Sequence, residues 1–326
     1  MIDKSKKTVA FVVPTGIGAS IGGFAGDASS WARKFAKEMN LIVNPNVVNA
    51  ACFSGITENM LYVEGWTLSK FFKGDINLIP YTENKIGIIF DKSIPQDILN
   101  IHINTINAVK TVYGVNIVDF EITQNACGVE FFLTNNGISS GELNYPKTIL
   151  DSAKSLIKKG ANALAIVTLF NETDENDDYA QGNAVDVVGG IEAVISHYIS
   201  SELLIPTAHA PAFLDNEISK KIISPKASAE YITPTFLPCI LLGLEKAPQI
   251  TTDKEKGMNI KELSGLIMPY NCLGSSIVFD AIKNNVTVYT IKENSTILNI
   301  DKSLLKLQNS IIEFKSYSEC LKYLKN

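Results

Sequence analysis

The sequence predicts an α/β protein in which mainly parallel strands form one or more sheets with helices on their faces. Short apolar runs, such as residues 163–169, alternate along the chain with amphipathic stretches such as residues 146–159. The runs are almost continuously apolar, which is typical of parallel strands buried on both faces. The chain has 326 residues, of which 46% are hydrophobic and 19% charged, so it is long enough for two domains or one large unit with a sizeable core.

The strands are predicted where an apolar run is short, and the helices where apolar residues recur at three- and four-residue spacing. The predicted strands are residues 8–13, 41–43, 85–91, 115–122, 129–133, 163–169, 266–269, 287–291 and 310–314. The predicted helices are residues 28–39, 95–112, 146–159, 187–200 and 275–283, followed by a short C-terminal helix. The clearest stripes are Ile149, Leu150, Ala153, Leu156 and Ile157 in one helix and Ile191, Val194, Ile195, Tyr198 and Ile199 in another.

We expect two lobes, residues 1–125 with a glycine-rich loop and residues 126–326 with a cluster of His, Asp and Glu. A single compact unit is the alternative. The acidic stretch 171–179 is expected to be an exposed loop rather than a linker, because no tract rich in Pro, Gly and Ser interrupts the chain. Similar Gly/Ser sequences at residues 18–20, 138–141 and 274–276 raise the further alternative of repeated βα units, although such turns favour Gly and Ser in any case.

Charge and cysteine content exclude several classes of partner. The chain has 29 Lys and Arg against 34 Asp and Glu, a net charge of −5, with no long basic run, so nucleic acid is not expected as a partner. Five scattered cysteines without a C-x-x-C pair argue against a disulfide scaffold or zinc ribbon. No apolar run reaches the about 20 residues of a membrane helix or the about 7–15 of a signal peptide. We therefore expect a cytoplasmic protein without a membrane partner, with homo-oligomerisation left open.

A glycine-rich segment follows the first predicted strand and is the first candidate binding site. Residues 16–26 contain five glycines, which allow the backbone to approach a ligand closely and expose N–H groups to it. The spacing does not match a dinucleotide or NTP fingerprint, so no NAD or NTP cofactor is expected. Since Arg33 is the only arginine, we expect backbone N–H groups of residues 15–23 to bind any anion. The candidate contacts are Thr15, Gly16, Gly18, Ser20, Gly22 and Gly23.

The second predicted strand is followed by Asn46 and Asn49, whose amides are candidates for orienting a polar substrate. Ligands of α/β proteins bind at the carboxyl ends of parallel strands, which is where both segments are expected to lie. The alternative is that these amides serve local turns. We predict that residues 16–23, Asn46, Asn49 and His209 line one cleft.

The densest set of reactive side chains lies between residues 179 and 211. It contains Asp186, Glu192, His197 and His209, and two of the chain's three histidines. Histidine is the natural general base near neutral pH, so His209 is the candidate base or metal ligand, with Asp186 or Glu192 orienting it. Glu192 and His197 are five residues apart and do not converge as an H-E-x-x-H pair would. A catalytic divalent metal stays an open alternative, and the cofactor is therefore unknown.

Cys239 is the last candidate catalytic residue, because a thiol near His209 would be an activated nucleophile. Apolar neighbours on both sides favour the other interpretation, a small buried hydrophobic side chain. His102 shares a helical stripe with Leu99, Ile103 and Ile106, and we interpret it as structural.

Several of these segments together resemble the signature blocks of an uncharacterised bacterial and plastid family known only as a domain of unknown function. The blocks are residues 14–27, 44–50, 62–65, 189–197, 208–211 and 236–239, and the resemblance spans about residues 8–300. It brings no reaction with it, but it supports treating the blocks as one working site. The sequence departs from the family's usual Gly-Val-Asp-Pro at residues 183–188, where Asp186 is nevertheless kept.

A second resemblance is confined to the serine-containing segments. The sequence Ser139-Ser140-Gly141-x-Leu143 is similar to a serine block of the cyclic amide hydrolases, such as cyanuric acid hydrolase and barbiturase. That resemblance implies three repeated units with a serine–lysine pair in each, and makes Ser139, Ser140 and Ser275 candidate substrate contacts. Ser20 departs from it, because it lies too near the N-terminus to follow a lysine-bearing strand.

The function expected from these residues is an enzyme, most simply a hydrolase, acting on a small anionic or amide-bearing metabolite. A non-catalytic metabolite sensor would use the same loop without needing the His, Asp and Glu cluster. An isomerase or lyase using Cys239 and His209 is the third alternative.

Overall fold

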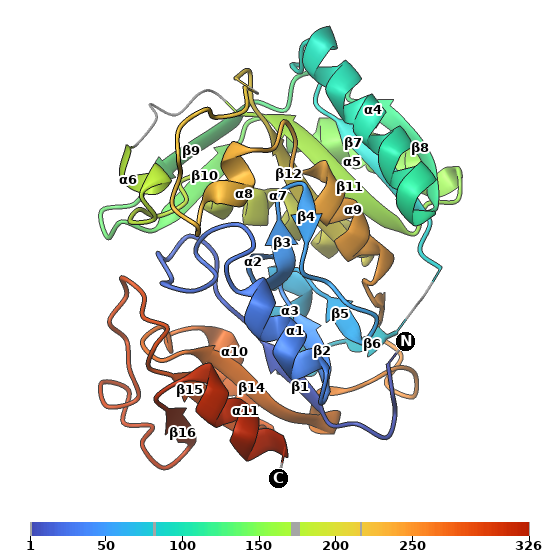
Figure 1. Ribbon diagram of the computed structural model, residues 1–326. Coiled ribbons are helices and arrows are strands. Elements are labelled where there is room, and N and C mark those ends of the chain that lie inside the picture. Colours follow the sequence, from blue (N-terminus) through green and yellow to red (C-terminus); the bar gives the residue numbers. More distant parts are fainter. Residues whose placement is uncertain (1, 81–82, 171–176, 216, 326) are drawn as a thin grey trace.

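The computed structural model describes residues 2–80, 83–170, 177–215 and 217–325. Two parallel sheets lie one above the other in Figure 1, the lower one built from both ends of the chain and the upper one from its middle. The fold class predicted from the sequence, mainly parallel sheets covered by helices, is confirmed. No helix in the described part of the chain is both long and apolar enough to cross a membrane.

The lower sheet has six parallel strands in the order β16-β15-β14-β1-β2-β5. Their bounds are Thr8–Phe11 (β1), Asn40–Val43 (β2), Met60–Tyr62 (β5), Leu263–Pro269 (β14), Val288–Ile291 (β15) and Ile311–Phe314 (β16). Alternate residues of β1 are buried on opposite faces. Val9 and Phe11 belong to the same hydrophobic cluster as helices α1 (Ser29–Ala36) and α11 (Tyr317–Lys325). Ala10 faces α3 (Gly65–Lys73) and α10 (Ser276–Lys283).

The upper sheet has four parallel strands in the order β12-β11-β7-β8. Their bounds are Ile86–Phe90 (β7), Ile117–Ile122 (β8), Ala163–Leu169 (β11) and Thr207–Ala212 (β12). Helices α4 (Gln96–Tyr113) and α9 (Leu237–Glu245) cover one face, and α5 (Pro146–Lys158) and α7 (Gly189–Leu203) cover the other. An antiparallel hairpin, β9 (Val129–Leu133) and β10 (Ser139–Leu143), packs on α7.

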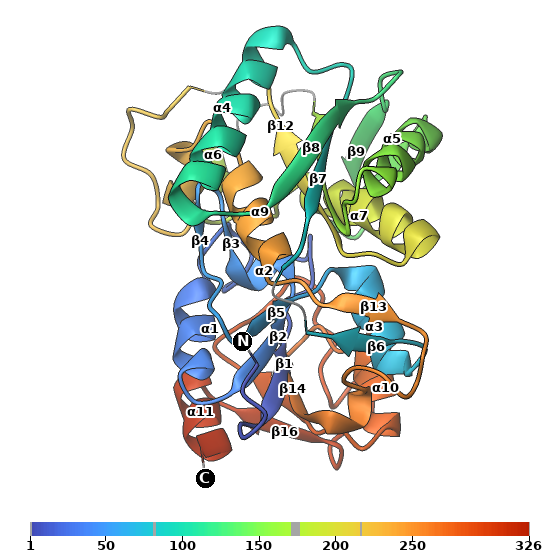
Figure 2. The same ribbon diagram turned by 90° about the vertical axis from the view of Figure 1, so that its right-hand side faces the viewer.

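Smaller elements join the two sheets. The strands β6 (Asn77–Ile79) and β13 (Gln249–Thr251) pair antiparallel, next to the two stretches where the chain passes between the sheets. Figure 2 shows the hairpin of β3 (Asn49–Ala50) and β4 (Phe53–Ser54) standing beside α9. Short helices complete the described structure: α2 (Pro45–Val48), α6 (Asp177–Ala180), α8 (Ser228–Tyr231) and the 3-10 helix η1 (Ile260–Glu262).

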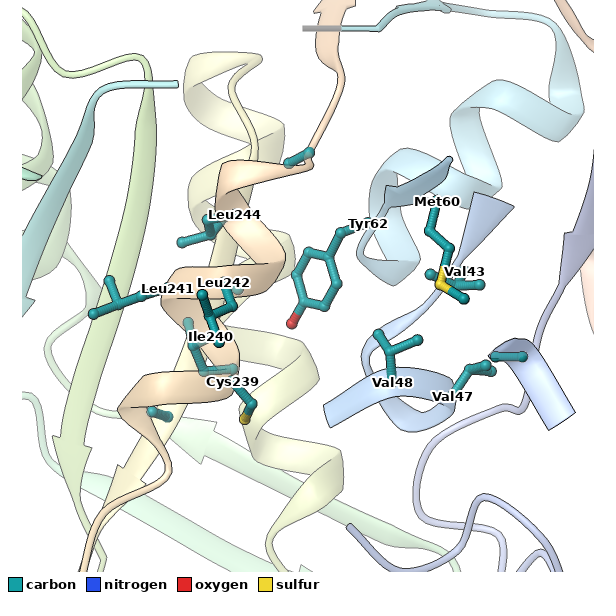
Figure 3. Packing of buried hydrophobic residues seen from close by; sticks show 14 of the residues in the cluster. Val43, Val47, Val48, Met60, Tyr62, Cys239, Ile240, Leu241, Leu242 and Leu244 are labelled. Atoms are coloured by element: carbon teal, nitrogen blue, oxygen red, sulfur yellow. The ribbon is translucent and has the colours of Figure 1, made fainter. Parts of the chain in front are cut away.

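The contact between the two halves is a packed hydrophobic core. Figure 3 shows Tyr62 and Met60 of β5, with Val43, Val47 and Val48, facing the side of α9 that carries Cys239 and Leu242. Gly243 lets this helix approach, because a Cβ there would lie 2.7 Å from Cε2 of the Tyr62 ring. Burial of these side chains fixes the two sheets relative to each other.

Several elements differ from the expectation. Residues 207–212 form strand β12, so His209 lies inside a strand and not after one. Ser139 and Ser140 lie in strand β10 of the hairpin and not in a βα turn, so the three serine segments are not equivalent. Helices α3 and α9 were not predicted from the sequence. Of the stretch 171–179, residues 171–176 lie outside the described residues.

That residues 1–125 and 126–326 fold as separate lobes remains a prediction. The two sheets do not follow that boundary. Strands β7 and β8, before residue 125, pair with β11 and β12. Strand β14 pairs with β1 at the N-terminal end of the chain. The middle segment is thus inserted between the two ends that build the lower sheet.

Candidate functional site

A cleft of about 1260 Å³ opens between the two sheets. It is lined by the loops that follow β1 and β2, by α7 and the residues before it, by β12, and by residues 213–240. The cleft brings together almost all of the side chains singled out from the sequence. The lining includes Thr15, Gly16, Gly18, Gly22, Gly23, Asn46, Asn49, Asp186, Glu192, His197, His209, Cys239 and Ser275. Ser20, Ser139 and Ser140 are not among the lining residues.

The glycine-rich loop uses part of its backbone for its own structure. The N–H groups of Ser20, Ile21 and Gly22 donate to Ser295 O (2.8 Å), Asn294 Oδ1 (3.0 Å) and Asp27 Oδ1 (2.7 Å). By contrast, the N–H groups of residues 16–19 have no hydrogen-bond partner among the residues that the structure describes. The expected row of donors is therefore reduced to this short stretch, which lines the cleft.

Three of the loop glycines have a left-handed backbone: φ is +70° at Gly16, +57° at Gly18 and +91° at Gly22. A Cβ at Gly22 would lie 2.9 Å from Val13 Cγ1. Substitution with valine at Gly18 or Gly22 is therefore expected to lower stability by about 1–3 kcal/mol through strain.

The asparagines after β2 serve mainly to join two loops. Asn44 is buried and pairs with the backbone of Val13, accepting from its N–H (3.0 Å) and donating to its carbonyl (2.7 Å). Asn46 Nδ2 donates to Pro14 O at 3.3 Å. Asn49 lines the cleft, and its Oδ1 has no partner in the described part of the chain. These contacts fit the alternative of local structural amides for Asn46. Burial raises the pKa of the Tyr62 hydroxyl, and the Asn49 side chain, which lines the cleft, acts on that pKa in the opposite direction.

His209 is held between two side chains at the back of the cleft. Its Nε2 lies 2.7 Å from Thr168 Oγ1 on β11, and its Nδ1 lies 3.1 Å from Glu192 Oε1 on α7. The His209 side chain is 1% exposed, whereas that of Glu192 is 24% exposed. Of the two side chains, that of Glu192 is therefore the more accessible from the cleft.

Burial shifts the pKa values of this pair in opposite directions. It raises the pKa of Glu192 to about 8 and lowers the pKa of His209 to about 3, because the charged form of each is poorly solvated. His209 is therefore neutral at physiological pH, and the Glu192–His209 pair carries no net charge over most of its population. A carboxyl group that titrates near neutrality is suited to both donating and accepting a proton.

Two further carboxyl groups share this environment. Asp186 Oδ1 accepts from the N–H groups of Val188 (3.0 Å) and Gly189 (3.2 Å) at the start of α7. Burial, followed by the nearby Glu192, raises the pKa of Asp186 to about 7. Burial, followed by Asp186, raises the pKa of Glu230 to about 8. Like charges in a poorly solvated cleft favour the protonated forms.

Glu230 is the main site residue that sequence reasoning missed. Its Oε1 accepts from the N–H of Ala25 (2.7 Å) and both oxygens lie within 3.0 Å of the Tyr179 hydroxyl, so it ties the glycine-rich loop to the upper half. Tyr179 also packs on Phe24, with ring centroids 4.7 Å apart. No periodicity marks Glu230, since it lies in a short helix in an irregular polar stretch.

Glu64 and His197 meet at the other side of the cleft. Glu64 caps helix α3 by accepting from the N–H groups of Trp66 (2.7 Å) and Thr67 (2.8 Å), and from the Thr67 hydroxyl. Its Oε2 lies 3.6 Å from His197 Nε2. Burial raises the pKa of Glu64 to about 7 and lowers the pKa of His197 to about 4. Glu64 belonged to one of the sequence blocks that carried the family resemblance, but was not singled out as a site residue.

The serine and cysteine candidates have local roles. Ser139 Oγ donates to Val187 O (2.7 Å) and accepts from Gly190 N–H (2.8 Å), which fixes the start of α7 on β10. Ser20 contacts Asn294 and the Glu293 carbonyl. Cys239 lines the cleft, but its thiol donates to Phe236 O and burial raises its pKa to about 12. His102 is buried and contacts Ile98 O at 2.9 Å, as its structural interpretation requires.

No group of three His, Cys, Asp or Glu side chains within the described ranges is arranged to hold a metal ion. The carboxyl groups of the cleft instead reach it from separate elements, each with its own hydrogen-bond donors.

The raised carboxyl pKa values predict a stability that falls with pH. A carboxyl group whose pKa is higher in the folded protein than in the unfolded chain stabilises the fold at pH values below its pKa in the unfolded chain. This stabilisation is lost as the pH rises through its pKa in the folded protein. The two histidines act in the opposite sense, but only below their ordinary pKa of 6.5. Between pH 6.5 and about 8 only the carboxyl effect of Glu64, Asp186, Glu192 and Glu230 remains.

We therefore expect the melting temperature to fall between pH 6.5 and 8.5, as measured by scanning fluorimetry in buffers of constant ionic strength. Glu230→Gln should flatten this slope, and the exposed Glu142→Gln should not. A melting temperature that is constant or rises across this window would contradict the protonation states described above.

Comparison with known proteins places the chain in a family. A protein from Synechococcus sp. named as an uncharacterized lipoprotein is 33% identical over 307 residues, which cover 92% of this chain and 85% of that protein. No solved structure matches significantly. The family model described as "Protein of unknown function (DUF3326)" matches residues 8–325. The resemblance inferred from the sequence blocks is thus confirmed, and the chain belongs to the DUF3326 family.

Proposed function

We propose that the chain is an enzyme that hydrolyses a small amide-bearing metabolite in the cleft, with Glu192 as the acid–base group. One observation carries this proposal: a carboxyl group with a pKa near neutrality faces a large cleft while its other contact, His209, holds it in place. The cleft lies at the carboxyl ends of β1 and β2, where ligands of parallel α/β sheets bind.

Each residue of the site has a separate role in the proposed reaction. The Glu192 carboxylate takes a proton from water, the resulting hydroxide attacks the amide carbonyl, and the same carboxyl group then delivers the proton to the leaving amine. The N–H groups of residues 16–19 are the donors for the oxygen that becomes negative during the attack. Thr168 and His209 are positioning residues, because they act on the substrate only through Glu192.

The lining of the cleft favours an amide over an anion among the substrates expected from the sequence. Its described residues include neither Lys nor Arg, which an anionic ligand would be expected to meet. The isomerase or lyase alternative is supported less well, because the Cys239 thiol is bound to Phe236 O and its raised pKa disfavours a thiolate.

A non-catalytic metabolite sensor is the second candidate, and the position of the cleft between two sheets favours it specifically. A ligand that contacts both halves could change their relative arrangement without chemistry. The cytoplasmic location remains a prediction, and the name of the Synechococcus relative suggests a lipid-anchored location as the alternative.

The experiment that separates the two measures binding and turnover on the same protein. We expect wild-type protein to release amine or ammonia from amides that it binds, as followed by a coupled ammonia assay and by proton NMR. His209→Ala should keep ligand binding and lose most of the turnover. Ligand binding by the wild type without any turnover across the amide panel would favour the sensor and overturn the enzyme.

A further inference from the structure

The charged side chains that line the cleft are of one sign. The acidic ones come from separate parts of the chain, and no Lys or Arg is present among the described lining residues. They are Glu64, Asp186, Glu192, Asp215, Glu217 and Glu230. Lys226 lies with its Nζ 5.8 Å from the centroid of the Phe24 ring, and it does not line the cleft. Both histidines are neutral at physiological pH, so the protein itself supplies no counter-charge.

Two carboxyl oxygens in the cleft accept no hydrogen bond from the residues described. Asp186 uses Oδ1 for the N–H groups of Val188 and Gly189, and Glu192 uses Oε1 for His209. Asp186 Oδ2 and Glu192 Oε2 have no donor among the residues described. Neither oxygen is among the buried polar atoms without a partner, so both are accessible from the cleft and a ligand can supply their donors.

Backbone N–H groups without a hydrogen-bond partner lie close to these carboxyl groups. The N–H groups of residues 16–19 have no partner among the described residues. Their loop lies against the start of α7, because a Cβ at Gly189 would be 2.8 Å from Thr15 Cγ2 and one at Gly18 would be 3.0 Å from Val185 Cγ2. The cleft thus offers N–H donors and carboxyl acceptors side by side, which is complementary to a ligand with a carbonyl group and a cationic group.

We infer that the ligand of this cleft is an organic cation, with an ammonium or guanidinium group for Asp186, whose charge the neighbouring Glu192 reinforces, and a carbonyl oxygen for the N–H groups of residues 16–19. The inference rests on the proposed function in taking that carbonyl to be the amide carbonyl. Two aromatic rings that line the same cleft, Phe24 and Tyr179, pack against each other at 43°, and aromatic rings attract cations.

Three probes with one acetamide group and the same five-methylene chain test the inference. N-acetylcadaverine ends in an ammonium group, N-hexylacetamide in a methyl group, and 6-acetamidohexanoate in a carboxylate. We expect calorimetric titration of the wild-type protein at pH 7.5 to give N-acetylcadaverine a Kd at least about tenfold lower than that of N-hexylacetamide, and 6-acetamidohexanoate the weakest binding. Equal binding of the cationic and neutral probes, preference for the carboxylate, or no binding by any probe would overturn the inference.

A matched pair of variants assigns the preference to the two carboxyl groups. Asp186→Asn combined with Glu192→Gln should bring the cationic and neutral probes to within about twofold of each other, because both replacements remove the negative charge. Glu142→Gln, an exposed residue outside the cleft, should keep the full preference. A double variant that is folded by circular dichroism and still prefers the cation would overturn the assignment. If the double variant does not fold, the single Asp186→Asn variant is compared in the same way.

The outcomes separate this inference from the proposed function. Preferential binding of N-acetylcadaverine without release of amine from any amide would leave the inference standing and remove the hydrolase. Hydrolysis confined to neutral or acidic amides would support the hydrolase and remove the cationic ligand.

Discussion

Replacing Glu192 with glutamine is expected to lower kcat for amide hydrolysis by about 10²- to 10⁴-fold, the usual contribution of a positioned acid–base group. Glutamine has nearly the same shape and can keep the hydrogen bond to His209 Nδ1, which spans 3.1 Å. It cannot transfer a proton. Since burial raises the pKa of Glu192 to about 8, the kcat/KM of the wild type should rise with pH up to that value, and the variant should lose this dependence.

The same variant should remain folded, and it should be at least as stable as the wild type at pH 8.5. At that pH the wild-type fold must hold a poorly solvated carboxylate, which glutamine avoids. Steady-state kinetics from pH 6 to 9 and melting curves on the same samples check both statements, with Glu142→Gln as the control. Activity within about threefold of the wild type would remove Glu192 from the chemistry.

Replacing Gly190 with alanine is expected to destabilise the fold by on the order of 3 kcal/mol, the upper range for overpacking. A Cβ at this position would lie 2.2 Å from Ser139 O, 2.3 Å from Ser139 C and 2.6 Å from Ser140 N, all of them backbone atoms of β10. The strand has little freedom to yield, because Ser139 N–H donates to Gly16 O and Ser139 Oγ bridges Val187 O and Gly190 N–H. The start of α7 must therefore move away from β10.

That movement should also affect ligand binding, because Asp186 lies just before the first turn of α7 and Glu192 lies within it. Chemical denaturation and ligand titration measure the two effects separately. Gly274→Ala is the control: a Cβ there would meet only Ile300 side-chain atoms, the nearest at 3.2 Å, so a small change is expected. A Gly190→Ala protein that unfolds like the wild type would show that α7 does not depend on close packing against β10.

Much of the secondary structure was predictable because it reflects local burial. Strand β11 and helix α5 have the predicted bounds to within a residue, since both bury nearly continuous or regularly spaced apolar side chains. The loops after β1 and β2 could be assigned to one cleft for a similar reason: turns at the carboxyl ends of adjacent parallel strands meet at one edge of a sheet. Helix α9 was missed because seven of its nine residues are buried, so it shows no amphipathic stripe.

The roles within the site were not predictable in the same way. His209 was singled out because histidine titrates near neutral pH, but its environment depends on Thr168 of the neighbouring strand and Glu192 of a covering helix. Burial by these partners lowers the pKa of His209 and raises that of Glu192, which is why we propose Glu192 as the acid–base group. Glu230 carries no sequence signal at all, because its partners Ala25 and Tyr179 are far away along the chain.

The sequence by itself therefore determined the α/β class, the family, most strands and helices, and the segments that line the cleft. These features depend on periodicity, on turn residues and on strand ends, all of which are local. The tertiary structure alone decided that the two ends of the chain build one sheet around an inserted middle segment, as the pairing of β1 with β14 shows. It also decided which carboxyl groups face one another without a counter-charge. Both depend on contacts between residues far apart in the chain, and apolar periodicity records that a residue is buried but not which partner buries it.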